Sequence, residues 1–396
     1  MKRLECLDGL RGVLAMYVVL GHAAPFALLP AGLQSAVSHG GAAVDIFFIL
    51  SGLVISQSLD RLHGDRRRFL LARVLRIYPV FLPVFALAVA AQPLPCGFGG
   101  MPWIGPDSAA RDICSDLWQQ PWPAEISAHL LMIHGLFPHG ILPDVWVSFL
   151  GAAWSLSTEW QFYILAMLAW RQGPPRITWL LLLLAGATLF WQAMVSDAWQ
   201  FSRAFLPNKA QFFALGVASQ TVVREAMEGR GRTALPGYGL VLAVTLAICA
   251  AQGQWGKLLP PLAWSVCLGA QLLPGAGLAR AGLRPLAQVL RCRTALWFGA
   301  ISYPIYLVNE PIQKIVSPLL GGIAHGDGVV FTAIWLPAAI GLPILAAAWL
   351  HRSVEVPAMR WGKCRSGTVR DRPALITRPP AANPASAAVQ RAARGL

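Results

Sequence analysis

The sequence predicts an all-α protein that spans a membrane as a helical bundle of about ten transmembrane helices. Of its 396 residues, 56% are hydrophobic and only 13% are charged, whereas soluble domains carry about 25% charged residues. Many hydrophobic residues fall in runs of about 20, the length at which a helix crosses a bilayer. Positive residues cluster between alternate runs, as is typical of loops on the cytoplasmic side of a membrane.

The hydrophobic runs define the predicted helices in order. We expect spans at 8–29, 41–60, 75–92, 152–171, 177–196, 208–224, 235–252, 258–275, 295–316 and 329–350. With both termini in the cytoplasm, the inner segments are 1–7, 61–74, 172–176, 225–234, 276–294 and 351–396. Lys and Arg fall in these segments or at the inner ends of the spans, except Arg111, Arg203, Lys209, Lys257 and Lys314. The net charge of +14 therefore reports topology, and we expect the lipid bilayer and no nucleic acid as a partner.

The chain is predicted to hold one membrane domain, residues 1–363, and a short tail, residues 364–396. The tail is basic and rich in Ala, Pro and Arg, a composition that does not bury enough apolar surface to fold. We expect it to be disordered and cytoplasmic.

Residues 93–151 form the longest expected outer segment. Within it, the partly apolar stretch 126–137 is too short to span alone, so we expect it to lie at the membrane interface or to re-enter. Cys96 and Cys114 are the only two of the seven cysteines that share an outer segment, which predicts a disulfide in an oxidising compartment. The cysteine spacing gives no metal-ligand pattern, and we expect no metal.

The first span carries Asp8, Arg11 and His22, each of which is costly in lipid and so suggests function. Arg11 and His22 are eleven residues apart, about three helical turns, so they share one face with a rise of roughly 16 Å. Arg11 is then at the inner end and His22 near mid-membrane. The alternative is that Arg11 extends to the headgroups and His22 is a packing residue.

The fourth span places Ser155, Glu159 and Tyr163 on one helical face. Glu159 is about 10 Å below the outer surface by helical rise, nearly the depth of His22. A histidine and a carboxylate at one level can act as a base and its orienting partner. Glu159 would alternatively tie helices together through a Ser, Tyr or Arg.

The second and third spans add charges near their ends. Asp45 is expected in the first turn of its helix, where capping and functional roles are equally plausible. Arg73 and Arg76 share a face at the inner boundary, where Arg11 also lies, and three converging guanidinium groups suit phosphate binding. Arginines are, however, expected at inner helix ends for topology alone.

The ninth span has a polar stripe that includes Tyr306 and Asn309, with Glu310 beside it. Such a stripe faces other helices or a water-filled cavity. Near the inner end of the last span, Glu355 lies among arginines, most simply as an ion-pair partner.

Together these motifs resemble the membrane acyltransferase 3 family, integral-membrane O-acyltransferases of bacterial surface polysaccharides and related acceptors. The matching pieces are Leu7-Asp8-Gly9-Leu10-Arg11-Gly12 with His22, Asp45-Ile46-Phe47-Phe48 to Ser51-Gly52, Arg73-Val74-Leu75-Arg76-Ile77-Tyr78-Pro79, Trp154-Ser155-Leu156-Ser157-Thr158-Glu159 to Phe162-Tyr163, Ser302-Tyr303 to Tyr306-Leu307, and Glu355-Val356-Pro357. The family usually has a histidine where this chain has Asn309, so Asn309 is expected to be a substrate contact at most. Nothing after residue 363 is expected to form the extracellular hydrolase-like domain that many relatives append, so the transfer would be completed within the membrane domain or with a separate periplasmic partner.

The resemblance and the charge pattern together suggest an enzyme of the bacterial inner membrane. Acyl-coenzyme A, with acetyl as the expected acyl group, would place its phosphates on Arg11, Arg73 and Arg76. His22 would act as general base for an acceptor hydroxyl or as a transient acyl carrier, with Glu159 orienting it or receiving the acceptor. The acceptor would be a surface glycan, a lipid-linked sugar or a secreted metabolite. Asp8, Asp45, Ser155, Tyr163, Tyr306 and Asn309 are substrate or structural candidates.

A transporter or flippase for a lipid-linked sugar or acyl compound is the alternative function. It would use the same polar interior without covalent chemistry. A single histidine in line with an inner arginine cluster favours a phosphate-bearing donor instead.

Overall fold

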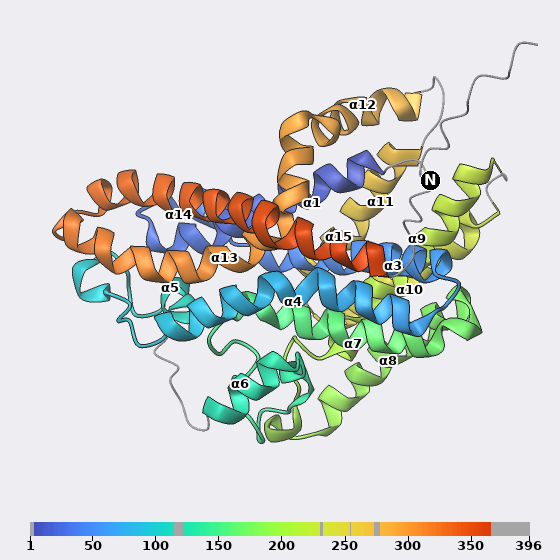
Figure 1. Cartoon of the computed structure of the whole chain (residues 1–396), viewed down its shortest axis with the longest axis horizontal. Coiled ribbons are helices and arrows are strands. Elements are labelled where there is room, and N and C mark those ends of the chain that lie inside the picture. Colours follow the sequence, from blue (N-terminus) through green and yellow to red (C-terminus); the bar gives the residue numbers. More distant parts are fainter. Residues whose placement is uncertain (1–3, 115–121, 230–232, 254, 273–277, 366–396) are drawn as a thin grey trace, which may run out of the picture.

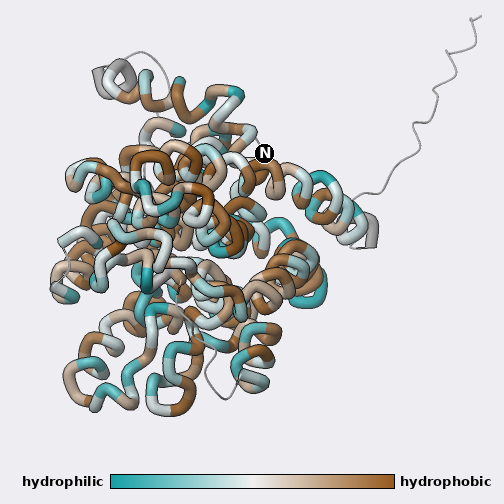
Figure 2. The backbone as a smooth tube through the Cα atoms, turned by 90° about the vertical axis from the view of Figure 1, so that its left-hand side faces the viewer, coloured by the Kyte–Doolittle hydropathy of each residue, from teal (hydrophilic) through white to brown (hydrophobic). Residues whose placement is uncertain are grey.

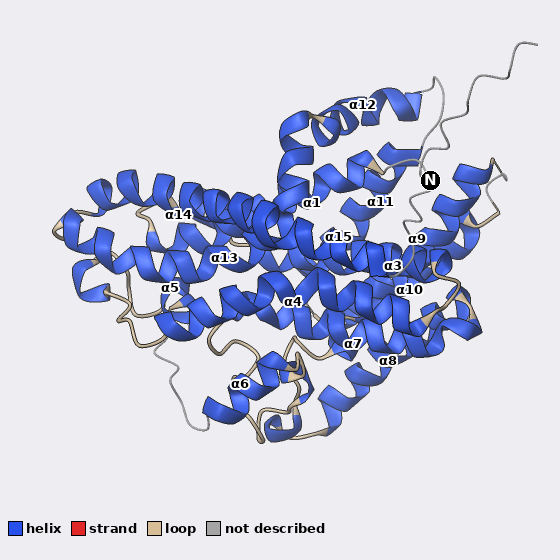
Figure 3. Cartoon of the chain, in the orientation of Figure 1, coloured by secondary structure: helices blue, strands red, loops and turns tan. Residues whose placement is uncertain are grey.

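The computed structural model describes residues 4–114, 122–229, 233–253, 255–272 and 278–365. These residues form helices joined by turns and loops, and none of them lies in a β-strand (Figure 3). The predicted all-α fold is confirmed. The last helix extends to Arg365, and residues 366–396 of the predicted tail lie outside the described residues.

A helix coincides with each of the ten predicted spans. The α-helices are α1 (Glu5–Ala23), α2 (Ala31–Val37), α3 (Gly40–Arg61), α4 (Arg66–Ala91), α5 (Ala109–Ile113), α6 (Trp122–Leu130), α7 (Trp154–Ala169), α8 (Pro174–Met194), α9 (Ala210–Glu228), α10 (Leu235–Ala251), α11 (Leu259–Leu272), α12 (Leu278–Arg291), α13 (Arg293–Ala324), α14 (Gly328–Leu350) and α15 (Val356–Arg365). Among the described residues, five segments are long and apolar enough to cross a membrane: Glu5–Phe26, Ala31–Arg61, Arg66–Ala91, Pro174–Met194 and Gly328–Gly362. The total of about ten crossings stays a prediction.

The long helices run along the long axis of the molecule (Figure 1). The turn between α13 and α14 lies at one end of this axis, and the start of α1 lies toward the other end. Hydrophobic segments lie on the outside of the bundle as well as inside it (Figure 2). Large apolar side chains such as Leu183, Phe190 and Leu345 are exposed, as expected for helices that face lipid rather than water.

Glycines allow the central helices to touch through their backbones. A Cβ atom on Gly299 of α13 would lie 2.1 Å from the carbonyl oxygen of Asp8 in α1. A Cβ atom on Gly216 of α9 would lie 2.0 Å from the carbonyl oxygen of Ile49 in α3. Small residues at such crossings bring backbones together where lipid gives no hydrophobic drive for association. The close contact of α1 with α13 sets the site described below.

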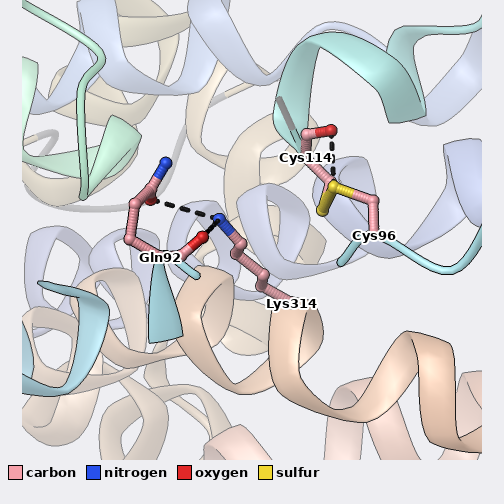
Figure 4. The surroundings of a disulfide bond; sticks show 4 residues. All are labelled: Gln92, Cys96, Cys114 and Lys314. Carbon is pink, nitrogen blue, oxygen red and sulfur yellow. Dashed lines mark hydrogen bonds between the residues drawn. A yellow bond between two sulfur atoms is a disulfide. The ribbon is translucent and has the colours of Figure 1, made fainter. Parts of the chain in front are cut away.

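The segment between α4 and α7 covers the end of the bundle away from the start of α1. The predicted disulfide is confirmed, because Cys96 and Cys114 are joined with a Cα–Cα distance of 5.8 Å (Figure 4). Beside it, Lys314 of α13 donates to Oε1 of Gln92 at 3.1 Å. This contact gives the one lysine predicted inside a span a polar partner.

The stretch 126–137 folds as part of α6, a turn and a short 3-10 helix, His134–Leu136. With nine residues, α6 is too short to cross a bilayer. Tyr78 of α4 donates to the carbonyl of Leu130, and the backbone N–H of Gly135 donates to Oγ of Ser157 in α7. The stretch is therefore anchored on α4 and α7.

Candidate active site

Three arginines from two helices meet between two cavities. Arg11 of α1 and Arg73 and Arg76 of α4 line both of them. The larger cavity, about 730 Å³, lies at the end where α1 begins, and its wall includes Asp8. The smaller cavity, about 140 Å³, lies deeper between the helices. The structure thus brings together the arginines that the sequence placed at one boundary.

Arg73 has hydrogen-bonding capacity to spare. Its Nη2 donates weakly to Oγ of Ser58 at 3.4 Å, while its buried Nε has no hydrogen-bond partner among the described residues. The guanidinium lies over the rings of Phe69 and Tyr163, with its Cζ atom 5.6 and 5.9 Å from their centroids. These rings fix the plane of the guanidinium and leave N–H donors for a ligand.

Arg76 is already paired. Its Nη1 forms an ion pair with the buried carboxylate of Glu355, which also accepts from Nδ1 of His351 at 2.6 Å. The predicted pairing of Glu355 with the arginines is confirmed. Because Glu355 offsets the charge of Arg76, Arg76 is held in place more firmly than Arg73 and offers less net charge to a ligand.

Polar side chains from α7 and α13 line the smaller cavity. The hydroxyl of Tyr163 donates to Glu159 at 3.0 Å, one turn away on the same face, as their spacing predicted. The hydroxyls of Ser155 and Tyr306 lie 3.0 Å apart and join α7 to α13. The cavity therefore holds one carboxylate, Glu159, facing the arginine cluster.

His22, in the last turn of α1, contacts Asn309 of α13. Nδ1 of His22 lies 2.8 Å from Oδ1 of Asn309. The amide nitrogen of Asn309 donates to the carbonyls of Ile305 and Tyr306 at 3.1 and 2.6 Å, which fixes the amide orientation. Oδ1 must then accept from Nδ1–H, so Nε2 of the neutral ring carries the free lone pair.

This contact corrects two expectations from the sequence. Glu159 is not the partner that orients His22, because α7 directs it toward the arginines and Tyr163. Asn309 is not merely a substrate contact, because α13 packs along α1 and carries its amide to the imidazole. Asn309 follows Tyr306 by three residues, about one turn, so the His22–Asn309 pair adjoins the wall of the smaller cavity.

Asp45 also differs from its expected position. The helix α3 begins at Gly40, so Asp45 lies beyond the first turn and does not cap it. Its Oδ1 accepts from Nζ of Lys209 at 2.6 Å, and both side chains are buried. The sequence counted Lys209 as an outer charge and gave no sign of this partner, which is 164 residues away.

The comparisons with known proteins agree with this arrangement. A family model described as an acyltransferase domain, acyltransferase 3, matches residues 4–352. The chain belongs to the acyltransferase 3 family. This acyltransferase is 27% identical to "Acyltransferase MdmB" of Streptomyces mycarofaciens over 394 residues, covering 90% of this chain and 92% of that protein. It is 37% identical to "Protein 2 in picA locus" of Rhizobium radiobacter over 93 residues, 22% of this chain and 46% of that protein. No solved structure matches it significantly.

Glu310 is a functional neighbour of this acyltransferase's site whose role sequence reasoning missed. Its two carboxylate oxygens accept the backbone N–H groups of Gly151 and Ala152 at 2.9 and 2.7 Å. These groups precede α7, so Glu310 fixes the start of α7 to α13 directly beside Asn309. The sequence showed Glu310 beside a polar stripe but gave no indication of a backbone partner.

A second missed feature is a pair of buried histidines in the segment over α4 and α7. The rings of His129 and His134 stack with centroids 4.1 Å apart. Their Nε2 atoms donate to the carbonyls of Val145 and Ala153, and within the part of the chain that the structure describes neither Nδ1 has a hydrogen-bond partner. Burial lowers the pKa of His134 to about 4 and lowers the pKa of His129 well below its usual value. Both rings are therefore neutral structural groups at pH 7.

Proposed function

We propose that this acyltransferase moves an acyl group, acetyl in the first instance, from acyl-coenzyme A to a hydroxyl of a surface glycan, a lipid-linked sugar or a secreted metabolite. The observation that carries the proposal is the arginine cluster between two cavities, with a histidine held by an amide just beyond the deeper one. The arginine cluster, the smaller cavity and the histidine follow one another in this order, which suits a donor that has phosphates at one end and a thioester at the other.

The donor phosphates would bind in the larger cavity. Its volume of about 730 Å³ is in the range of ligand sites in proteins. Arg73 lines this cavity with a guanidinium group that donates only weakly to Ser58, and guanidinium groups bind phosphate through two parallel N–H bonds. We propose that the protein lies in a bacterial inner membrane. This end of the bundle would face the cytoplasm, where acyl-coenzyme A is available.

His22 would act as the general base. In the proposed step, its Nε2 takes the proton of the acceptor hydroxyl, and the hydroxyl oxygen forms a bond to the thioester carbonyl carbon. The carbon–sulfur bond then breaks, and the coenzyme leaves as a thiolate that accepts the proton. Asn309 supports this chemistry by keeping the proton of the resting ring on Nδ1, and by accepting from it when the ring becomes an imidazolium.

The test uses purified protein in detergent with acetyl-coenzyme A and no acceptor. An acyltransferase with this site should bind the donor and hydrolyse it slowly, with water in place of the hydroxyl, whereas a transporter would release no free coenzyme. Mass spectrometry of surface glycans and secreted metabolites from a deletion strain would then identify the acceptor by a lost acetyl group. If the purified protein neither binds acetyl-coenzyme A nor releases free coenzyme from it, the proposal is overturned.

A further inference from the structure

Three cations gather at the end of the bundle opposite the larger cavity. Arg203 and Lys209 lie between α8 and α9, and Lys257 lies just before α11. All three interact electrostatically with the buried carboxylate of Asp45. They are three of the four Lys and Arg residues that the topology places on the outer side.

This position is unfavourable for cations on two independent grounds. Outer segments of membrane proteins are depleted in Lys and Arg. Lys209 also immediately precedes the start of α9, and Lys257 lies two residues before the start of α11, positions where the helix dipole favours anions. Asp45 offsets one of the three charges, so the cluster keeps excess positive charge.

Arg203 is the member of the cluster that is open to a ligand. Its Cζ lies 4.7 Å from the ring centroid of Trp146 and 5.8 Å from that of Trp154. Nζ of Lys209 is also 5.8 Å from the Trp154 ring, but Lys209 is buried against Asp45. Arg203 is exposed, and no carboxylate forms a salt bridge with it among the described residues. The indole rings hold its guanidinium while its N–H donors remain available.

The cluster adjoins the proposed reaction centre. Trp154 is the first residue of α7 and precedes Ser155, whose hydroxyl contacts Tyr306 in the smaller cavity. Tyr306 is one turn from Asn309, the partner of His22. An acceptor that enters from this end would therefore meet Arg203 before it reaches the base.

We propose that Arg203, supported by Lys209 and Lys257, forms an acceptor subsite that binds an oxyanion, either a carboxylate or a phosphate, carried by the acceptor. The site would make this acyltransferase selective for acidic sugars or sugar phosphates over neutral sugars. This inference rests on the proposed function, since it assigns the acceptor to the side opposite the donor. It adds the chemical class of acceptor, which neither the family nor its relatives' names supply.

The experiment compares the binding of methyl glucoside, methyl glucuronide and glucose 1-phosphate by ligand-observed NMR. The protein is kept in a polyoxyethylene detergent that has neither a sugar nor a phosphate. We expect one or both anionic sugars to bind about tenfold more tightly than the neutral one, the factor typical of one charge-assisted contact. Arg203→Gln should abolish this preference, and Arg203→Lys should keep part of it.

Arg111→Gln is the matched control. Arg111 is also an outer arginine over an aromatic ring, 4.6 Å from Phe98, but its Nε donates to the carbonyl of Gly105 on the disulfide segment. Arg111→Gln should leave the preference for anionic sugars intact. Equal binding of all three sugars, or a preference that survives Arg203→Gln, would overturn the subsite.

Two further readouts separate the alternatives. Phosphatidylglycerol nanodiscs test whether the cluster binds lipid headgroups instead of an acceptor. In that case the protein in detergent shows no preference for the anionic sugars, and the inference is wrong. Acetyl-coenzyme A hydrolysis in the same preparation tests the proposed function separately. Hydrolysis without anion preference would reject only the subsite, whereas preference without hydrolysis or transfer would reject the proposed reaction.

Discussion

Nδ1 of His22 lies 2.8 Å from Oδ1 of Asn309, which joins α1 to α13 at the residue proposed as the general base. The amide of Asn309 is itself fixed by two carbonyls of its own helix. The neighbouring Glu310 fixes the start of α7. One turn of α13 therefore positions both the base and the helix that lines the smaller cavity.

Replacing Asn309 by alanine should lower the rate of acyl transfer without weakening donor binding. The imidazole would lose the acceptor that sets its tautomer, and loss of such a partner typically costs about 10²-fold or more in rate. The measurement is single-turnover acetyl transfer together with acetyl-coenzyme A affinity. Ser317→Ala is the control, because Ser317 is buried on the same helix and its hydroxyl has no hydrogen-bond partner in the described ranges. A wild-type rate in Asn309→Ala would remove Asn309 from the site.

Arg73→Lys should weaken acetyl-coenzyme A binding by about tenfold, because lysine keeps the charge but loses the planar fork. Titration calorimetry at moderate salt measures the affinity with nonspecific attraction screened. Arg66→Lys provides the comparison, since Arg66 is exposed and donates to the carbonyl of Leu168 at a distance of 3.5 Å. If both variants bind the donor like the wild type, Arg73 is a topology marker and not a phosphate ligand.

Asp45→Asn should destabilise the protein by about 3–5 kcal/mol, because it leaves the ammonium of Lys209 buried without its counter-charge. The double variant Asp45→Asn with Lys209→Met should recover most of this loss, since it removes both buried charges. Thermal unfolding in detergent, followed by circular dichroism, compares the three proteins. If Asp45→Asn alone is as stable as the wild type, the Asp45–Lys209 pair does not stabilise the fold.

The buried histidine pair predicts a loss of stability in acid. Burial lowers the pKa of His134 to about 4, below the value of about 6.5 expected in the unfolded chain. The unfolded state therefore binds the proton first, and stability falls as the pH drops from about 6.5 toward 4, by about 1.4 kcal/mol per unit for each such group. Unfolding temperatures between pH 7.5 and 4.5 measure the slope. His134→Gln should flatten it, whereas replacing the exposed-loop His63 by Gln should not.

The sequence predicted those parts of the site that depend on one helix or on neighbouring residues. Helical spacing placed Ser155, Glu159 and Tyr163 on one face, and the structure puts all three around the smaller cavity. Charge distribution brought Arg11, Arg73 and Arg76 to one level, and the shared outer segment predicted the Cys96–Cys114 disulfide.

Contacts between distant helices were not predictable in the same way. The His22–Asn309 contact joins residues 287 positions apart, and it depends on how α1 and α13 rotate about their close glycine contact. The local sequences of Asp45 and Lys209 do not indicate that the two residues are partners, and their pairing follows from the packing of α3 on α9. Helical periodicity predicts on which face of its helix a residue lies, but it does not predict which other helix packs against that face.

Acetyl transfer by His22→Gln tests whether His22 is the general base. Glutamine keeps hydrogen-bonding capacity at this position but cannot take a proton from the acceptor hydroxyl. Purified wild-type and variant proteins, matched for folding by their unfolding temperatures, are mixed with acetyl-coenzyme A and the acceptor identified from the deletion strain. We expect donor binding to persist in His22→Gln while transfer falls by about 10²-fold or more. Transfer at the wild-type rate in His22→Gln would contradict the assignment of His22 as the base.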